Sequence, residues 1–198
     1  MEKVIQIFKD HYGYAYLKDL KSQGVHTDTI CKLRDEGIIE KVKAGLYKLT
    51  DMPIVSHQGM IDICMSMPQA VVCLQSALSY YELTTTVPSL IMIAVRREQK
   101  PSRIQYPPMK VFYFSSKNYE SGIEEIKTES GKFRIYYVEK TIVDCFRYRK
   151  KLGENIAIEG LKNYLLTKKY DLNKVYKYAK AGNMLNIIRP YIESMTIS

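Results

Sequence analysis

The hydrophobic pattern of the N-terminal region predicts three short helices followed by a hairpin. Apolar residues recur at helical spacing in the segments 2–11, 16–23 and 28–36. From Ile38 to Leu49, β-forming residues alternate with charged ones, and Gly45 supplies a turn position where positive φ is accessible. Short amphipathic helices bury their apolar stripes only by packing together, so this order predicts a winged helix-turn-helix.

The predicted helix 28–36 and the hairpin after it carry the clearest functional implication. Gly37 falls where a left-handed cap would end this helix. A helix of about nine residues, rising about 1.5 Å per residue, fits a DNA major groove roughly 12 Å wide. The hairpin would then reach the flanking backbone. We take as candidate base contacts Thr27, Thr29 and Lys32, and as candidate contacts to phosphates or the minor groove Arg34, Lys41, Lys43, Tyr47 and Lys48.

Beyond Pro53 the pattern predicts a second, larger domain. Proline cannot extend the hairpin strand inside a sheet, so we place the boundary there, with a winged-helix domain over 1–52 and a second domain over 53–198. The expected helices are 57–67, 75–83, 139–152, 154–169, 172–180 and 184–195, and the expected strands are 71–74, 90–95, 111–115, 123–128 and 133–138. The fold class is therefore α+β, with a mixed α+β C-terminal domain that ends in a helical bundle.

The charge of the chain is strongly basic and unevenly placed. Thirty Lys and Arg oppose 21 Asp and Glu, for a net charge of +9, yet residues 51–95 contain no Lys or Arg. A basic surface attracts phosphate backbones. For the basic segment 96–108, a solvated loop is the simpler interpretation. Because the charges of the 28–36 helix nearly cancel, we add as a second phosphate-contacting surface Arg96, Arg97, Lys100 and Arg103.

The remaining chemistry favours a soluble protein without metal or cofactor. Cys31, Cys64, Cys73 and Cys145 are widely spaced and lie in apolar segments, which predicts buried free thiols in a reducing cytoplasm. The longest apolar runs are far shorter than the roughly 20 residues of a membrane span, so we expect a cytoplasmic protein that contacts no membrane. The sequence has neither a phosphate-binding glycine loop nor a dinucleotide fingerprint.

The strongest cluster of titratable residues is Glu139, Lys140 and Asp144, at the start of a predicted helix. An acidic residue in a first turn is expected from the helix dipole, and Asp144 with Lys140 is an ordinary i, i+4 pair. We therefore expect no enzymatic activity. A nucleic-acid enzyme stays as a further hypothesis, which requires Glu139 or Asp144 to matter for turnover.

Several segments taken together resemble one family over nearly the whole chain. They are KAGLYKLTD, LQSALSYYELT, SLIMIAVRR, YPP before VFYF, and EKTIVDCFRYRKKLG followed by AIEGLKNYL. Their order and spacing are similar to those of the AbiEi antitoxins of bacterial type IV toxin-antitoxin systems. The resemblance implies a DNA-binding winged helix joined to an antitoxin domain. It also implies binding to inverted repeats in the operon's own promoter, autorepression, and neutralisation of a cognate nucleotidyltransferase-like toxin without a stable complex, in phage defence by abortive infection.

One position departs from that family, and one alternative function stays open. Many members have Arg directly before the wing glycine, where this chain has Ala44, so a minor-groove contact would pass to Lys43 or Lys41. In the alternative, the winged helix is structural and the C-terminal helices bind a partner toxin directly. The oligomeric state is also open, and a monomer that binds DNA cooperatively is one option.

Overall fold

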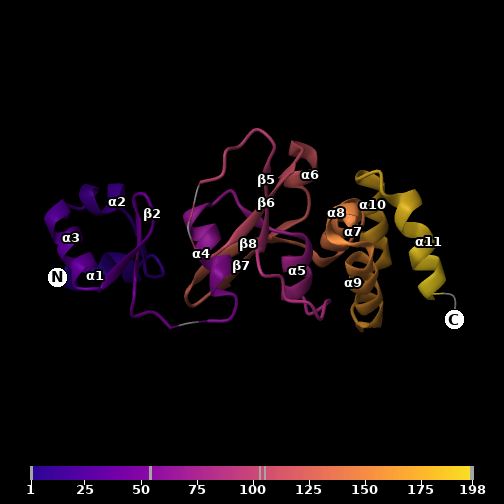
Figure 1. Cartoon of the computed structure of the whole chain (residues 1–198), viewed down its shortest axis with the longest axis horizontal. Coiled ribbons are helices and arrows are strands. Elements are labelled where there is room, and N and C mark those ends of the chain that lie inside the picture. Colours follow the sequence, from indigo (N-terminus) through magenta and orange to yellow (C-terminus); the bar gives the residue numbers. More distant parts are fainter. Residues whose placement is uncertain (1, 54, 103, 105, 197–198) are drawn as a thin grey trace. The chain divides into compact units, whose positions relative to one another are not determined.

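The computed structural model describes residues 2–53, 55–102, 104 and 106–196, and over these the chain folds as an α+β protein with two sheets (Figure 1). Packing divides the chain into two units. The first comprises Met1–Ala70, Lys100–Pro108 and Glu125–Phe133, and the second comprises Val71–Gln99, Met109–Glu124 and Arg134–Ser198. The domain boundary expected at Pro53 stays a prediction.

The three N-terminal helices and the hairpin are present as predicted. Their bounds are α1 (Glu2–Lys9), α2 (Leu17–Ser22), α3 (Thr27–Asp35), β2 (Ile39–Lys43) and β3 (Leu46–Leu49). Phe8, Leu20 and Leu33 from the three helices are buried in one core together with Leu49 of the hairpin. Gly37 ends α3 with a φ of 70°, and Gly45 turns the hairpin with a φ of 74°, a backbone conformation that favours glycine.

A third strand in the first unit is absent from the sequence prediction. We expected a helix to begin at Tyr16, whereas β1 (Tyr14–Tyr16) pairs antiparallel with β3 and gives a sheet of order β1-β3-β2. Three residues are too short to display an alternating pattern, and this strand forms because its backbone pairs with residues far along the chain. A β-bulge lies in β2 between Lys41 and Lys43.

The next helix, α4 (Gln58–Ser66), packs against the small sheet on the face opposite the helical core. Residues directly opposite each other on antiparallel strands share a face, and Tyr16 is paired with the fully buried Leu46. The Tyr16 hydroxyl donates to the backbone oxygen of Met65, 3.1 Å away, and the Tyr14 hydroxyl donates to Asp62. Both faces of this small sheet are therefore covered.

The second sheet has the order β6-β5-β4-β8-β7. Its strands are β4 (Val71–Val72), β5 (Ile91–Arg96), β6 (Met109–Phe114), β7 (Ile123–Thr128) and β8 (Gly131–Tyr136). β5 is parallel to β6, and β4 is antiparallel to β5 but parallel to β8. All five predicted strands are therefore confirmed.

The helices of the second unit follow the prediction with two differences. They are α5 (Leu74–Tyr80), α6 (Ser116–Glu120), α7 (Val138–Arg147), α8 (Arg149–Leu152), α9 (Glu154–Leu166), α10 (Leu172–Ala181) and α11 (Leu185–Thr196). The short helix α6 was not predicted, because a single buried side chain, Tyr119, among five residues forms no apolar stripe. The expected helix 139–152 divides at Tyr148 into α7 and α8.

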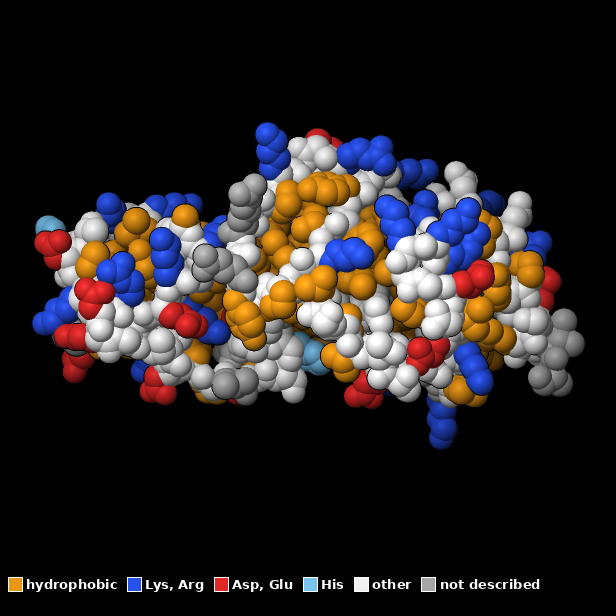
Figure 2. All heavy atoms as spheres, in the orientation of Figure 1, with side chains coloured by type: hydrophobic (Ala, Val, Ile, Leu, Met, Phe, Trp, Pro, Cys, Tyr) orange, Lys and Arg blue, Asp and Glu red, His pale blue; other side chains and the backbone are white. Residues whose placement is uncertain are grey.

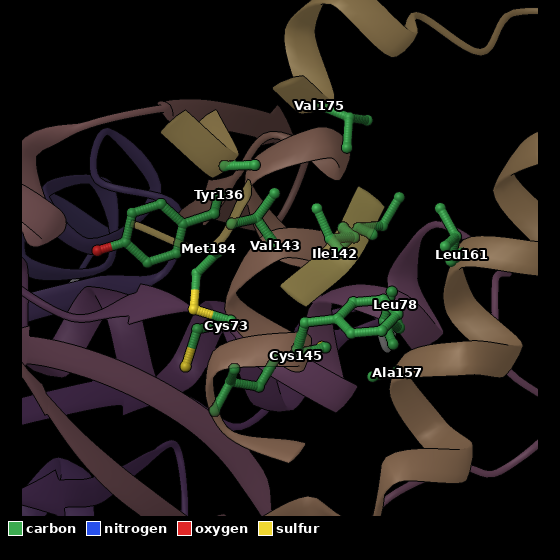
Figure 3. Packing of buried hydrophobic residues seen from close by; sticks show 14 of the residues in the cluster. Cys73, Leu78, Tyr136, Ile142, Val143, Cys145, Ala157, Leu161, Val175 and Met184 are labelled. Carbon is green, nitrogen blue, oxygen red and sulfur yellow. The ribbon is translucent and has the colours of Figure 1, made fainter. Parts of the chain in front are cut away.

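Helix α7 is the centre of the second unit, in contact with α5, α9, α10 and α11. Ile142 and Val143 of α7 lie among side chains of the neighbouring helices, including Leu161 of α9 and Val175 of α10 (Figure 3). Full burial of one such aliphatic side chain contributes about 1.5–3 kcal/mol. This core therefore holds α7 in place on several sides.

The four cysteines are free thiols. Cys64, Cys73 and Cys145 are buried as predicted, whereas Cys31 is only partly buried, so the prediction is wrong for that residue. The reason is that Cys31 lies on α3, which is covered along one side only. Among the described helices, none has both the length and the apolar character that crossing a membrane requires.

Candidate nucleic-acid interface

Helix α3 presents one wide face to solvent because only Ile30 and Leu33 anchor it to the core. Lys32 and Thr27 are exposed, and Thr29 is half-buried. Successive α-helical residues are rotated by about 100°, which separates Thr27 from Thr29 by about 160° around the axis. The three predicted base contacts therefore do not share one face: Thr29 and Lys32 lie on one flank, and Thr27 lies on the other.

Each basic side chain of α3 has an acidic neighbour. Lys32 Nζ lies 3.9 Å from Glu36 Oε1, and Arg34 Nη2 lies 2.8 Å from Asp35 Oδ1. The hydrogen bond from Arg34 to Asp35 raises the pKa of the guanidinium further above its ordinary value. In Figure 2, acidic and basic side chains lie near one another at the end of the first unit where Figure 1 draws α1 and α3. Because exposed ion pairs stabilise little, DNA phosphates can replace these carboxylates as partners.

The hairpin divides its lysines between two faces. Lys41 is opposite Tyr47, whose ring packs against the helical core, and the Lys41 side chain is exposed. Lys43 is opposite Leu46, and Lys48 is opposite Tyr14, so both lie on the face that α4 covers. Of the predicted hairpin contacts, Lys41 and Tyr47 therefore lie on the side of the helical core, and Lys43 and Lys48 do not.

Lys48 is bound within the first unit. Its Nζ lies 3.0 Å from Asp62 Oδ1, and each side chain retains only 13% exposure. The same carboxylate oxygen accepts hydrogen bonds from the Tyr14 hydroxyl and from Gln58 Nε2, the latter at 2.9 Å. The Lys48 charge is thus neutralised by α4.

Lys43 is partly enclosed by the loop between β5 and β6, to which Ser102 belongs. Its Nζ donates to Ser102 Oγ at 3.4 Å and lies 5.8 Å from the centroid of the Tyr16 ring. Burial lowers the pKa of Lys43. This lysine therefore holds the loop against the wing side of the sheet, and its charge is less available to DNA than that of Lys41.

The basic loop set is divided between the two units. The described residues between β5 and β6 form neither helix nor strand, as expected for a loop. Arg96 and the exposed Arg97 group with the second unit, where Arg96 Nη2 lies 2.7 Å from Glu120 Oε1. Lys100 groups with the first unit and is exposed, and Arg103 lies outside the described residues. The second phosphate-contacting surface therefore stays a prediction.

The titratable cluster of α7 is buried, which sequence spacing did not indicate. Glu139, Lys140 and Asp144 are 6%, 3% and 1% exposed. Lys140 Nζ donates to Asp144 Oδ2 and lies 4.7 Å from the centroid of the Tyr136 ring. Burial raises the pKa of Asp144 and lowers that of Lys140, while the pairing opposes both shifts. Because the apolar residues of α7 gather along one side of the helix and Lys140 and Asp144 lie on the other, the sequence carried no signal for the burial of this pair.

The Glu139 carboxylate is held apart from that pair. Its Oε1 accepts a hydrogen bond from the Tyr164 hydroxyl at 3.1 Å and lies 3.9 Å from Lys174 Nζ. Within the described ranges, no group of three or more His, Cys, Asp or Glu side chains could hold a metal ion.

No family model matches the chain, and no curated protein matches it.

Proposed function

We propose that this protein is a sequence-specific repressor that binds double-stranded DNA through a winged helix in its first unit. The observation that carries the proposal is the element order α1-β1-α2-α3-β2-β3 with the sheet order β1-β3-β2, because a helix-turn-helix followed by a hairpin is arranged in this way. The exposed face of α3 and the net charge of +9 support it further.

In this proposal α3 enters the major groove, and Thr29 and Lys32 on one flank reach base edges. Arg34 and Lys41 contact phosphates, since both are exposed. Ala44 at the turn gives the wing a small tip without a charged side chain of its own. With Lys43 and Lys48 bound to Ser102 and Asp62, few phosphate contacts remain, and a shallow salt dependence is expected.

The resemblance to AbiEi antitoxins extends the proposal to the cellular role. The protein is then a cytoplasmic autorepressor of its own operon, bound to inverted repeats in the promoter. It also acts as an antitoxin that counters a nucleotidyltransferase-like toxin without a stable complex. A toxicity-rescue assay that uses the neighbouring gene tests this part separately from DNA binding.

The test of DNA binding is a gel shift on the upstream repeats at several salt concentrations, with Lys41→Ala and Lys32→Ala. Lys41→Ala should weaken binding to all sequences and lower the salt slope by about one. Lys32→Ala should lose about 1–3 kcal/mol of discrimination at one base pair. Lys9→Ala removes an exposed charge from the end of α1 and should bind as the parent does. Unchanged binding by both α3 and hairpin variants would exclude the proposal.

A second function has one observation in its favour. Leu166 and Tyr170, which end and follow α9, are 74% and 50% exposed. Large apolar side chains in solvent are typical of protein-binding surfaces when they occur close together. In this alternative the second unit binds the toxin directly, and the winged helix is structural. A stable complex on co-purification, with no retention on promoter DNA, would favour it.

A further inference from the structure

A hollow in the second unit is lined by polar and basic side chains. It has a volume of about 280 Å³ and lies between α6, α7 and the end of α10. Its basic and amide or hydroxyl lining includes the side chains of Lys117, Asn118, Ser121, Lys140, Arg147 and Asn183. Among the described residues that line it there is no Asp or Glu. Figure 2 shows Lys and Arg side chains gathered over this part of the second unit.

Two of the cations in the hollow are fixed in position. The Lys140 side chain is only 4% exposed, and its Nζ is oriented by Asp144. Arg147 Nη2 donates to the backbone oxygen of Gly182, 2.7 Å away. Arg147 Nε is buried and has no hydrogen-bond partner within the described structure, and it lies 3.6 Å from Asp144 Oδ1. Groups held in advance bind a ligand at a lower entropic cost.

The charges of the hollow match a dianion. Lys117, Lys140 and Arg147 supply three positive charges, and the single carboxylate of Asp144 behind them leaves two uncompensated. Asn118 and Asn183 add amide donors, and Ser121 adds a hydroxyl. Guanidinium and ammonium groups with neutral donors between them are the set that recognises phosphate. Ligand pockets usually measure about 300–1,000 Å³, so this hollow suits one phosphorylated group with little else.

We propose that this hollow binds a phosphate monoester. It lies in the second unit, so it is independent of the winged-helix surface proposed above. The same chemistry comes from two sources: a free small molecule such as a nucleoside monophosphate, or the terminal 5′-phosphate of a nucleic acid.

Calorimetric titration of the full-length protein in phosphate-free buffer tests the proposal. The probes are inorganic phosphate, adenosine monophosphate, adenosine, and one short oligonucleotide with and without a 5′-phosphate. The two phosphate-bearing small probes should bind, and adenosine should not. Stronger binding of the 5′-phosphorylated oligonucleotide than of adenosine monophosphate assigns the site to nucleic-acid ends, and the reverse order assigns it to a small molecule.

Two substitutions connect the binding to the hollow. Lys117→Gln removes an exposed charge and should weaken binding about tenfold, as expected for the loss of one charge-assisted contact. Gly182→Ala keeps the charge, but the added Cβ would clash with Arg147 Nη2 and displace the guanidinium. The φ of −93° at Gly182 is accessible to alanine, so the backbone tolerates this change. It too should weaken binding about tenfold.

Lys162→Gln is the matched control, because Lys162 is an exposed lysine of α9 that does not line the hollow. It should bind the phosphate probes as the parent does. Absence of phosphate and adenosine monophosphate binding in the parent would overturn the proposal. Equal losses in Lys117→Gln and Lys162→Gln would also overturn it, since binding would then reflect net charge alone. This pair of variants decides the question even if Gly182→Ala proves unstable in thermal unfolding.

Discussion

Helices α3 and α7 carry the same local pattern, a lysine followed four residues later by an acid, in opposite environments. On α3, Lys32 and Glu36 lie 3.9 Å apart with side chains 65% and 42% exposed. On α7, Lys140 and Asp144 are paired with side chains 4% and 1% exposed. The i, i+4 spacing predicts the pairing in both helices, but it contains no information about the solvent around them.

The difference follows from what packs against each helix. Two apolar side chains, Ile30 and Leu33, anchor α3 along one side. Helix α7 is surrounded by α5, α9, α10 and α11.

In water, ions about 4 Å apart attract by about 1 kcal/mol, so either partner is readily exchanged for another ion. In a core, loss of one partner leaves the other charge without water or counterion. An exposed pair is therefore suited to recognition, and a buried pair fixes the position of its members.

Removal of the buried acid is expected to have the largest effect. Asp144→Ala leaves the Lys140 and Arg147 cations side by side, and it should lower the free energy of unfolding by about 3–5 kcal/mol. Urea unfolding followed by circular dichroism measures this loss. The double variant Lys140→Met/Asp144→Leu, which removes both charges, should recover most of it. A single variant within 1 kcal/mol of the parent would show that water reaches this pair.

Asp62 is the intermediate case, because its side chain is 13% exposed. Asp62→Ala removes the acceptor shared by the Tyr14 hydroxyl, Gln58 Nε2 and Lys48 Nζ. Burial of donors without partners should cost about 1–3 kcal/mol in the same unfolding assay. Tyr14→Phe removes one donor and leaves the lysine paired, so a smaller loss is expected. If the two losses were equal, the lysine contact would contribute nothing.

Alkaline pH should destabilise the fold through its buried tyrosines. Burial, reinforced by hydrogen bonds to Asp62 and Glu124, raises the pKa of Tyr14 and Tyr81 well above the ordinary 10.0. Above pH 10 the unfolded chain loses protons that the folded chain retains, so stability present below that pH declines as the pH rises. The expected slope is about 1.4 kcal/mol per pH unit for each such tyrosine.

Urea unfolding at about pH 9, 10 and 11 measures the alkaline loss, with tyrosinate absorbance as the check on ionisation. Tyr14→Phe should show a shallower decline above pH 10, because one raised tyrosine pKa is absent. Stability that stays constant across this interval would mean that these hydroxyls ionise equally in the folded and unfolded chains.

Local pattern was sufficient for most elements, and long-range pairing accounts for those that were missed. The apolar spacing of Ile30 and Leu33 and the position of Gly37 predict α3 and its end. Strand β1 has no such signal, because it depends on the pairing of Tyr14 with Lys48. The cover of the small sheet by α4 depends on contacts between segments far apart in the chain, such as Tyr16 with Met65.

The residues of the candidate interface divide in the same way, into those placed by local geometry and those placed by contacts between distant segments. Helical geometry alone places Thr27 and Thr29 on different flanks of α3. The sequence could not show that Lys48 forms an ion pair with Asp62 and is not free to contact DNA. The pattern of residues around a strand lysine is the same whether that face of the sheet is exposed or covered. The hollow beside α7 brings Lys117 and Lys140 together from separate segments. Positions that depend on tertiary packing are therefore the ones that needed the structure.

The smallest effect on stability is expected at Glu36. Glu36→Gln should change the free energy of unfolding by less than about 0.5 kcal/mol, since both side chains of its pair are exposed. Operator affinity should rise about two- to fivefold at low salt, because the change frees Lys32 and removes a negative charge near the phosphates. High salt should erase the gain.

Gel shift and urea unfolding of the same Glu36→Gln preparation separate the two effects. Glu2→Gln, which removes an exposed carboxylate from the first turn of α1, is the matched control and should leave operator affinity unchanged. Weaker binding by Glu36→Gln would mean that Glu36 orients Lys32 toward the DNA, so that the α3 pair acts as a fixed unit as the α7 pair does. Tighter binding with unchanged stability would establish that Lys32 exchanges its carboxylate for phosphate, whereas Lys140 keeps Asp144 as its partner.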